Sequence, residues 1–211
     1  QKGLYILKPT ALDPDTLPQP RNRADTNAQS PWRIALLLGG PTEPCPWTEQ
    51  DWQAMLALAT SIAANPTLRL VAVTSRRTPD IWANTLLKET AGLPGLERIV
   101  DYRTAGPGSI AIAYRCDAMV VSGDSMSMVT EAVAARRPVA VLMPNKRNAS
   151  RDDATMDDLA AQKRICLLPA ASTTGETLLA SLDALQPMQE NHLDHLADVA
   201  CAMLGKPASR H

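Results

Sequence analysis

The sequence predicts an α/β fold, in which a Rossmann-like parallel sheet carries helices on both faces. Short runs rich in Val, Ile and Leu alternate with helical patterns through most of the 211 residues, which is the order of repeated βαβ units. Several of these runs are apolar throughout, as in strands that are buried on both faces. Because crossovers between parallel strands are right-handed, the loops that follow the strands should share one edge, where such sheets bind ligands.

The first part of the chain differs from the rest. Residues 8–31 hold five prolines and many polar residues without a hydrophobic period, which is typical of a linker or an extended surface segment. The chain also starts without Met or a signal-peptide core, which indicates an internal start. We therefore expect residues 1–30 to be an extended or linker segment, lying along the domain or leading from a missing N-terminal domain. Residues 31–211 should form the Rossmann-like domain.

Three strands and three helices are expected in the first half of this domain. The strands lie at 33–39, 68–75 and 96–102, and the helices at 48–65, 78–90 and 107–116. Thr48 is a suitable N-cap for the first helix, because acidic residues occupy the turn that follows. For the second helix the pattern predicts Thr78 as N-cap, with Pro79 at the first helical position.

The second half of the domain continues the alternation. The expected strands lie at 117–123, 138–144 and 164–169, and the expected helices at 125–135, 151–163, 175–186 and 188–204. No internal repeat or low-complexity tract interrupts this pattern, so these elements should extend the same sheet.

Charge and hydropathy exclude several kinds of partner. The formal charge is −1 and the pI is about 6.3, so no general field attracts nucleic acid or an anionic membrane. No apolar run is long enough to predict a transmembrane helix, although peripheral membrane association stays open. The four cysteines form no CxxC pair, and we expect buried, reduced thiols in a cytoplasmic protein: Cys45, Cys116, Cys166 and Cys201. His192 and His195 share a helix face without a further ligand, so no metal site is predicted.

The loop GDSMS and the helix after it form the most informative stretch. Gly123 permits a tight turn, and Asp124 or Ser125 can cap the helix. The amides of the first helical turn, at Met126 and Ser127, together with the helix dipole, then favour an anion such as a phosphate. Glu131 lies one turn beyond Ser127 on the same face, where its carboxylate can accept hydrogen bonds from ribose hydroxyls. The alternative is a capped helix that carries a solvated Glu.

Two other loops should lie at the same edge. In TSRRTP (74–79), one of Arg76 and Arg77 can bind a phosphate while the other faces solvent or an acid. Thr78 with Pro79 begins a helix whose amides add to the same anion site, so Ser75 and Thr78 are included among the expected nucleotide-binding residues. In GGPT (39–42), Gly39 and Gly40 permit close approach of a ligand, but a double Gly also simply ends a strand. The cations that follow the strand at 138–144 are expected on a solvated face: Lys146, Arg147 and Arg151.

These loops resemble the family named for the plant elongated-mitochondria fission protein, which has many bacterial members. The matching stretches are LLLGGPT (36–42), TSRRTP (74–79) and SGDSMSMVTEA with PV (122–132 and 138–139). The resemblance covers roughly residues 33–145. The chain departs from the family pattern at Arg136, where such sequences usually carry Gly. That position should end a helix, so the change affects the cap geometry, at a cost of about 1 kcal/mol.

The family in turn resembles the donor-binding half of GT-B glycosyltransferases. This implies a fold of the GT-B C-terminal-domain type and a nucleotide sugar as substrate, without metal or a further cofactor. By the same resemblance Ser125, Met126 and Ser127 would bind the diphosphate and Glu131 the ribose, while Arg76 and Arg77 offset the phosphate charge. The catalytic base would belong to the missing N-terminal acceptor domain and is not identified.

Two other functions fit a similar sequence. A nucleotide-sugar 2-epimerase has a comparable donor half, but it needs further acid/base carboxylates and usually a His between its domains, which is not found in the expected core. A non-catalytic interaction module of the mitochondrial-fission family type would keep the fold and transfer nothing. The products formed from a nucleotide sugar would distinguish the three.

Overall fold

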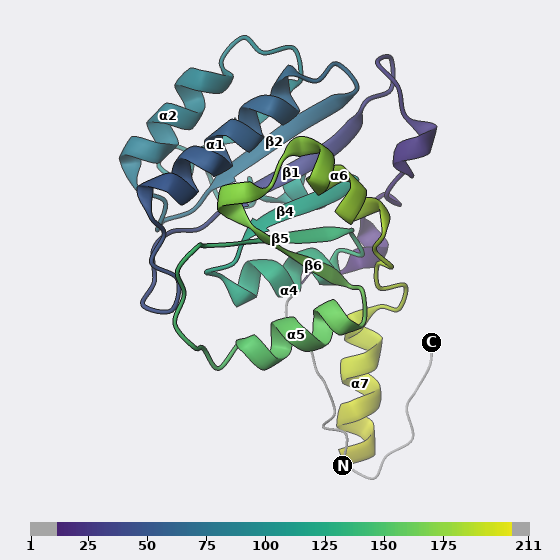
Figure 1. Cartoon of the computed structure of the whole chain (residues 1–211). Helices are drawn as coiled ribbons and strands as arrows, with labels where there is room; N and C mark the ends of the chain where they lie inside the picture. The colour runs from purple at the N-terminus through teal and green to yellow at the C-terminus, as the bar shows by residue number, and fades with distance from the viewer. Residues whose placement is uncertain (1–11, 204–211) are drawn as a thin grey trace.

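The computed structural model describes residues 12–203, and a six-stranded sheet forms its centre (Figure 1). The strands are β1 Trp32–Leu38, β2 Leu68–Thr74, β3 Leu96–Val100, β4 Ala118–Ser122, β5 Val139–Met143 and β6 Ile165–Pro169. Their spatial order is β3-β2-β1-β4-β5-β6, and every neighbouring pair is parallel. The predicted Rossmann-like sheet is therefore confirmed.

Helices cover both faces of the sheet (Figure 1). On one face lie α1 Glu49–Ala64, α2 Asp80–Thr90 and α6 Gly175–Asp183, and on the other α3 Ala111–Tyr114, α4 Met126–Ala134 and α5 Asp153–Ala161. In β1, Leu36 and Leu38 pack in the first core cluster, whereas Ala35 and Leu37 pack in the second. Burial on both faces explains why β5 is apolar throughout and why β4 is apolar up to its last residue, Ser122.

Four further elements complete the described part of the chain, and one of them contributes Ala170 to the first core cluster. They are the short 3-10 helices η1 Pro14–Thr16, η2 Arg23–Asp25 and η3 Ala170–Ser172, and the terminal helix α7 His192–Met203. No helix within residues 12–203 combines the length and the apolar character needed to cross a membrane.

The strand order reverses between β1 and β4. From β1 the chain builds outward through β2 to β3, and it then returns to place β4 on the other side of β1. Adjacent strands whose crossovers run in opposite directions leave a crevice at their carboxyl ends, which is where α/β sheets bind ligands. The loops after β1 and β4 flank this crevice.

Several helices begin or end at residues other than those expected from the sequence. Thr48 caps α1 as predicted, in a capping box with Asp51. The helix α2, however, begins at Asp80 after Pro79 as N-cap, because the Thr78 hydroxyl bonds elsewhere. The helix expected over 107–116 is reduced to α3, since Gly108 adopts a φ of 78° just before it. The last helix begins at His192, and residue 204, its expected end, lies outside the described residues.

Residues 12–31 pack against the domain. Arg21 donates to the Asp117 carboxylate from its backbone amide at 3.0 Å and from its guanidinium at 2.6 Å. Arg137, which is 2% exposed, donates to the carbonyl of Pro18 at 2.6 Å. Residues 1–11 lie outside the described residues, so the division of the chain at residue 30 stays a prediction.

Arg136 follows α4 with a φ of 58°. A residue with a side chain is strained in this left-handed region, which explains a preference for Gly at this position. The Arg136 guanidinium is held by Asp15 at 2.8 Å. The sequence departure therefore falls on a helix end, as expected, and the side chain gains a contact to the N-terminal segment.

The predicted burial of the cysteines is only partly confirmed. All four cysteines are free, with Cys45 and Cys116 buried, but Cys166 and Cys201 are half-buried rather than buried. His192 is also buried, and the side chain of His195 lies outside the description. Burial raises the pKa of the Cys116 thiol to about 12, so this thiol stays protonated at neutral pH.

Candidate functional site

A buried carboxylate, that of Asp124, connects the three loops at the crevice. Its side chain is 0% exposed. It accepts hydrogen bonds from Gly40 N at 3.1 Å, from Trp47 Nε1 at 3.1 Å and from the Arg77 guanidinium at 2.6 Å. The predicted meeting of the three loops at one edge is thus confirmed. Of the two residues expected to cap α4, Ser125 takes the N-cap position and Asp124 does not, but no side-chain hydrogen bond caps the helix.

The close approach of the three loops requires both glycines after β1. A Cβ placed on Gly39 would lie 2.0 Å from Asp124 Oδ2, and one on Gly40 would lie 1.9 Å from the backbone oxygen of Arg77. The Gly39 amide also donates to Ser122 Oγ at 2.7 Å. Both glycines therefore permit the loops to approach one another, which is a structural role in addition to any contact with a ligand.

The turn after β2 is held by the hydroxyl of Thr78. This oxygen accepts from Ser75 N at 2.9 Å and lies 2.8 Å from the carbonyl of Leu38 and 2.7 Å from that of Gly39. The Ser75 hydroxyl accepts from Arg77 N at 3.2 Å. These bonds attach the SRRTP turn to the end of β1, which is why Thr78 is not available to cap α2.

The two arginines of this turn have different environments. Arg77 forms an ion pair with Asp124, so its charge is balanced within the protein. Arg76 is exposed and pairs with no carboxylate among residues 12–203. The expectation that one arginine faces an acid is met, and Arg76 is the one whose charge is available to a ligand.

The first turn of α4 begins at the crevice. The amides at a helix N-terminus have no acceptor within the helix and lie at the positive end of its dipole. Ser125, Met126 and Ser127 are only half-buried. Thr130 donates its hydroxyl to the carbonyl of Met126 at 2.7 Å and contacts that of Ser127 at 3.0 Å, which holds the turn in shape. The turn can accept an anion at its exposed side.

Glu131 is not a solvated surface residue. It is half-buried, and its Oε2 accepts a short hydrogen bond from the hydroxyl of Tyr114, on α3. Tyr114 is 6% exposed. Burial, and secondarily this hydrogen bond, raise the pKa of Tyr114 well above its usual value, so the phenol remains a donor at every physiological pH. One oxygen of the Glu131 carboxylate is therefore occupied by the protein.

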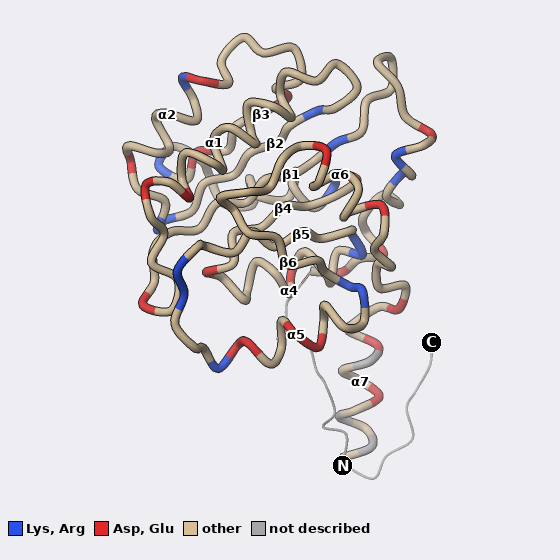
Figure 2. Tube along the Cα trace, in the orientation of Figure 1, with Lys and Arg blue, Asp and Glu red and all other residues tan. Residues whose placement is uncertain are grey.

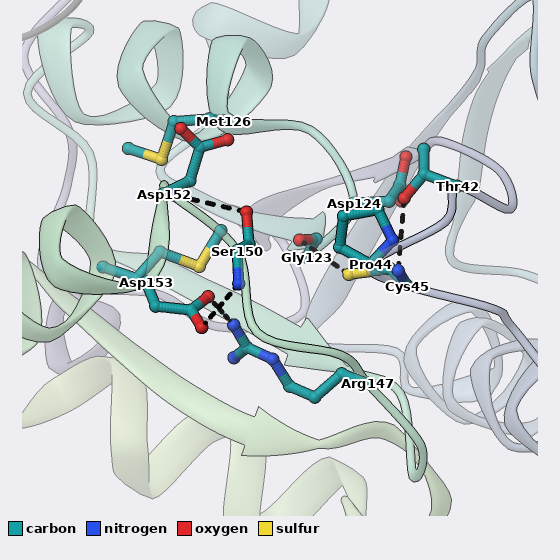
Figure 3. Close-up of a pocket in the computed structure, with 11 residues that line it drawn as sticks. Thr42, Pro44, Cys45, Gly123, Asp124, Met126, Arg147, Ser150, Asp152 and Asp153 are labelled. Atoms are coloured by element: carbon teal, nitrogen blue, oxygen red, sulfur yellow. Dashed lines mark hydrogen bonds and ion pairs between the residues drawn. The ribbon is translucent and has the colours of Figure 1, made fainter.

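A cavity of about 50 Å³ lies beside the first turn of α4 (Figure 3). It is enclosed by the loop after β1, the start of α4 and the segment between β5 and α5. Lining residues include Thr42, Cys45, Met126, Ser150, Asp152 and Asp153. Burial, and then the nearby Asp124 carboxylate, raise the pKa of the Cys45 thiol, so this thiol stays protonated at neutral pH.

The wall between β5 and α5 was not anticipated from the sequence. Arg147, which was expected on a solvated face, is paired with Asp153, and Figure 3 shows the two side chains turned toward each other. The same carboxylate accepts from Ser150 N at 3.0 Å. The segment follows a buried strand, as GDSMS does, so the rule that placed the other loops at this edge could also have identified Ser150, Asp152 and Asp153.

Metal chemistry has no ready centre in this region. Within residues 12–203, no three side chains from His, Cys, Asp and Glu are grouped so that they could hold a metal ion. Positive charge at the crevice comes from Arg76 and from the amides of α4. The arrangement can bind an anion and hydroxyl groups, and no catalytic acid or base is identified by its geometry.

Comparisons with known proteins agree with this architecture. The family model described as Mitochondrial fission ELM1 matches residues 8–206, and no curated protein matches the sequence significantly. Among solved structures, S. aureus MnaA in complex with UDP is similar, with a TM-score of 0.53 and 12% identity over 87% of this chain and 50% of that chain.

Two further structures are similar. One is described as a UDP-N-acetylglucosamine 2-epimerase from Listeria monocytogenes, with a TM-score of 0.50 and 15% identity over 84% of this chain and 47% of that one. The other is the glycotransferase of kitacinnamycin, with a TM-score of 0.49 and 17% identity over 79% of this chain and 38% of that one. At such identities the likeness to the first two structures shows the fold alone, and this chain spans about half of each of them.

Proposed function

The chain belongs to the Mitochondrial fission ELM1 family, and from its crevice we propose that it binds a nucleoside diphosphate sugar, as the donor-binding part of a metal-independent glycosyltransferase. One observation carries the proposal. The N-terminus of α4 opens at the point where strand order reverses, between loops that Asp124 joins and beside a polar cavity. A helix N-terminus at such a point is suited to a diphosphate.

The diphosphate would lie against the first turn of α4. The amides at Ser125, Met126 and Ser127 would donate to its oxygens. Gly123 would act on the loop itself, because a Cβ there would lie 2.6 Å from Met143 Sδ at the end of β5. Arg76, the exposed arginine of the SRRTP turn, would supply positive charge from the side of β2. Arg77 would contribute indirectly, by holding Asp124 and with it the loop that precedes α4.

The ribose would lie further along α4, at Glu131. This residue is one turn beyond Ser127, and one of its carboxylate oxygens is directed by Tyr114. Hydrogen bonds from ribose hydroxyls to a carboxylate are charge-assisted and therefore stronger than neutral ones. The position along α4 would set the nucleoside on one side of the diphosphate and leave the cavity on the other.

The group attached to the diphosphate would enter the cavity. Its volume of about 50 Å³ is small beside the several hundred Å³ of a complete small-molecule site, so it would receive only part of a sugar. The segment between β5 and α5 carries charges of both signs (Figure 2), and the charge of Asp153 at the cavity is balanced by Arg147. Asp152 also lines the cavity and forms no ion pair among the described residues, so its carboxylate could accept hydrogen bonds from hydroxyls but would repel a further phosphate. This favours a nucleotide sugar over a nucleoside triphosphate as ligand.

The rest of the active site would come from a second domain. Since this chain spans about half of the two similar structures, we propose that an N-terminal acceptor domain supplies the acceptor site and the catalytic base. The four free cysteines support a reducing, cytoplasmic location. Any peripheral contact with a membrane would then belong to the acceptor side of the enzyme.

Isothermal titration calorimetry tests the proposal. The protein is titrated with UDP, GDP, ADP and CMP in buffer that contains EDTA, and UDP is tried first because one similar structure was solved with it. We expect one nucleoside diphosphate to bind without metal, and inorganic phosphate to bind much more weakly. If the folded protein binds none of the four, the proposal is overturned.

Two other functions are distinguished by their products. The nucleotide-sugar 2-epimerase would convert a nucleotide sugar into its epimer, whereas the glycosyltransferase would release nucleotide and glycosylate an acceptor. A non-catalytic interaction module would bind without turnover. Incubating the natural full-length protein with the nucleotide sugar of the base that binds, followed by chromatography of the products, separates the three.

A further inference from the structure

The contact between Tyr114 and Glu131 joins two helices on one face of the sheet. Tyr114 lies at the end of the four-residue helix α3, and Glu131 lies in the middle of α4. The phenol hydroxyl donates to Glu131 Oε2. A buried tyrosine usually satisfies its hydroxyl on the nearest backbone carbonyl or on water, so its use on a half-buried carboxylate requires an explanation.

Tyr114 is itself firmly held. Its ring packs in the core cluster that includes Val129 and Val133 of α4. Its backbone carbonyl accepts from Arg137 Nε at 3.0 Å, and Arg137 is 2% exposed. The second bond of that guanidinium, to the carbonyl of Pro18 at 2.6 Å, fixes Arg137 in turn. The phenol therefore presents its hydroxyl from a site that is restrained at both the ring and the backbone.

The bond leaves one oxygen of Glu131 for a ligand. A carboxylate offers about four acceptor positions on its two oxygens. With Oε2 held by Tyr114, the Glu131 side chain is restricted to fewer rotamers, and Oε1 keeps its acceptor positions. An unrestrained Glu on a helix surface samples several rotamers, and ordering it when a ligand binds costs conformational entropy. A Glu that is ordered in advance avoids that cost.

We propose that Tyr114 is a positioning residue that orients the Glu131 carboxylate toward a ribose, and so gives the site a preference for ribonucleotides over 2′-deoxyribonucleotides. This inference rests on the proposed binding of a nucleoside diphosphate. The inference adds to the proposed function the residue on which the discrimination between ribose and 2′-deoxyribose depends. Tyr114 contacts no ligand in this scheme and acts only through Glu131.

The test measures the affinity of UDP and of 2′-deoxy-UDP for four forms of the chain. These are the wild type, Tyr114→Phe, Glu131→Gln and, as a matched control, Tyr102→Phe, in which the altered ring is 53% exposed. Should another base be the one that binds, its ribo and deoxy diphosphates replace the UDP pair. Thermal unfolding of each form monitors the fold.

We expect the wild type and Tyr102→Phe to bind the ribonucleotide at least tenfold more tightly than the deoxy form. Tyr114→Phe should lose most of this ratio, because affinity for the ribonucleotide falls while that for the deoxy form changes less than about threefold. Glu131→Gln should lose the ratio as well. If Tyr114 had a purely structural role, Tyr114→Phe would reduce the affinity for both nucleotides by the same factor and leave their ratio unchanged. That result overturns the inference.

The remaining outcomes separate this inference from the proposed function. If the wild type binds the diphosphate and prefers ribose, but only Glu131→Gln removes the preference, the role of Tyr114 is refuted and the proposed function stands. A wild type that binds both nucleotides equally also refutes it. If no nucleoside diphosphate binds to the wild type, the proposed function fails, and the inference fails with it.

Discussion

Arg77 and Asp124 are 47 positions apart in the sequence, yet the guanidinium of one lies 2.6 Å from the carboxylate of the other. The arginine is 42% exposed, whereas the carboxylate is completely buried. The pair connects the loop after β2 to the loop after β4 across the end of β1. The shape of the crevice therefore depends on an ion pair between two side chains that were both expected to face a ligand or a helix end.

Replacing Asp124 should destabilise the protein. Asp124→Ala leaves Gly40 N–H and Trp47 Nε1–H without their acceptor, and buried donors that lose their partners cost about 1–3 kcal/mol each. We expect the free energy of unfolding to fall by about 3 kcal/mol, measured by urea denaturation followed by Trp fluorescence. Asp124→Asn, which keeps one acceptor oxygen, should lose less. Equal stability of Asp124→Ala and the wild type would contradict this role.

A methyl group at Gly40 should disrupt the crevice. The Cβ of Gly40→Ala would lie 1.9 Å from the backbone oxygen of Arg77, so the loop after β1 or the SRRTP turn must move. We expect a loss of about 2 kcal/mol in stability, in the range of overpacking, and weaker nucleotide binding. The control is Gly106→Ala, whose Cβ would meet no atom within 4 Å and which should stay within about 0.5 kcal/mol of the wild type.

Glu131→Ala should reduce nucleotide affinity more than any other single change in the three loops. A carboxylate that accepts hydrogen bonds from ribose hydroxyls contributes about 1.5–3 kcal/mol for each bond, so calorimetry should show at least a tenfold loss. Because the buried Tyr114 hydroxyl also loses its acceptor, we expect stability to fall by about 1 kcal/mol as well. Glu131→Gln should keep most of that stability.

Replacing Arg76 should affect mainly nucleotide binding, whereas replacing Arg77 should affect mainly stability. Arg76→Ala should weaken nucleotide binding by less than Glu131→Ala does, since phosphate charge is shared with backbone amides, and should leave stability nearly unchanged. Arg77→Ala should lower stability, because Asp124 loses its counter-ion. If Arg76→Ala abolishes binding while Glu131→Ala does not, the ribose assignment is wrong and the site centres on the SRRTP turn.

Stability should depend on pH through Asp117. Burial alone would raise the pKa of this carboxyl, but hydrogen bonds from Arg21 and from the amide of Arg33 outweigh it and hold the pKa below its usual value. A lowered pKa in the folded state stabilises the protein above the unfolded-state pKa of about 4, and this stabilisation disappears as the pH falls through the folded-state pKa.

Asp117→Asn tests this dependence. At pH 7 the variant should be less stable than the wild type in urea denaturation, and the difference should shrink steadily as the pH is lowered below about 4. The control is Asp158→Asn, a change on an exposed face of α5, which should leave the stability at pH 7 within about 0.5 kcal/mol of the wild type. A constant difference between wild type and Asp117→Asn over the whole range would refute the assignment.

Strands and the placement of loops could be predicted from the sequence because they depend on local patterns. Uniformly apolar runs such as residues 139–143 are long enough for strands and too short for helices, and right-handed crossovers then place the loops. The partners of polar side chains depend instead on tertiary distances. A carboxylate after a strand, as in Asp124, can cap a helix or pair with a distant arginine, and the sequence of the loop alone does not distinguish the two.

The contact from Tyr114 to Glu131 could not be predicted from the sequence for the same reason. It depends on how α3 lies against α4, and α3 itself is shorter than expected because Gly108 has a positive φ. Without that geometry Glu131 looks like a solvated helix residue. The cavity residues Ser150, Asp152 and Asp153 were missed for a simpler reason: the cations of the loop after β5 were assigned to a solvated face, although this loop obeys the same positional rule as the other three.

The place of β1 in the sheet also affects how the protein folds. Ile34 of β1 pairs with Ala118 of β4, 84 positions later, whereas β1 and β2 are joined by a much shorter crossover. Contacts of long sequence separation close large loops and form slowly. The three strands β1 to β3 can associate before β4 arrives, but the crevice cannot exist until it does. A nucleotide would therefore bind the finished fold and not its first half, so it would slow unfolding and raise the apparent stability by mass action without accelerating the early steps of folding.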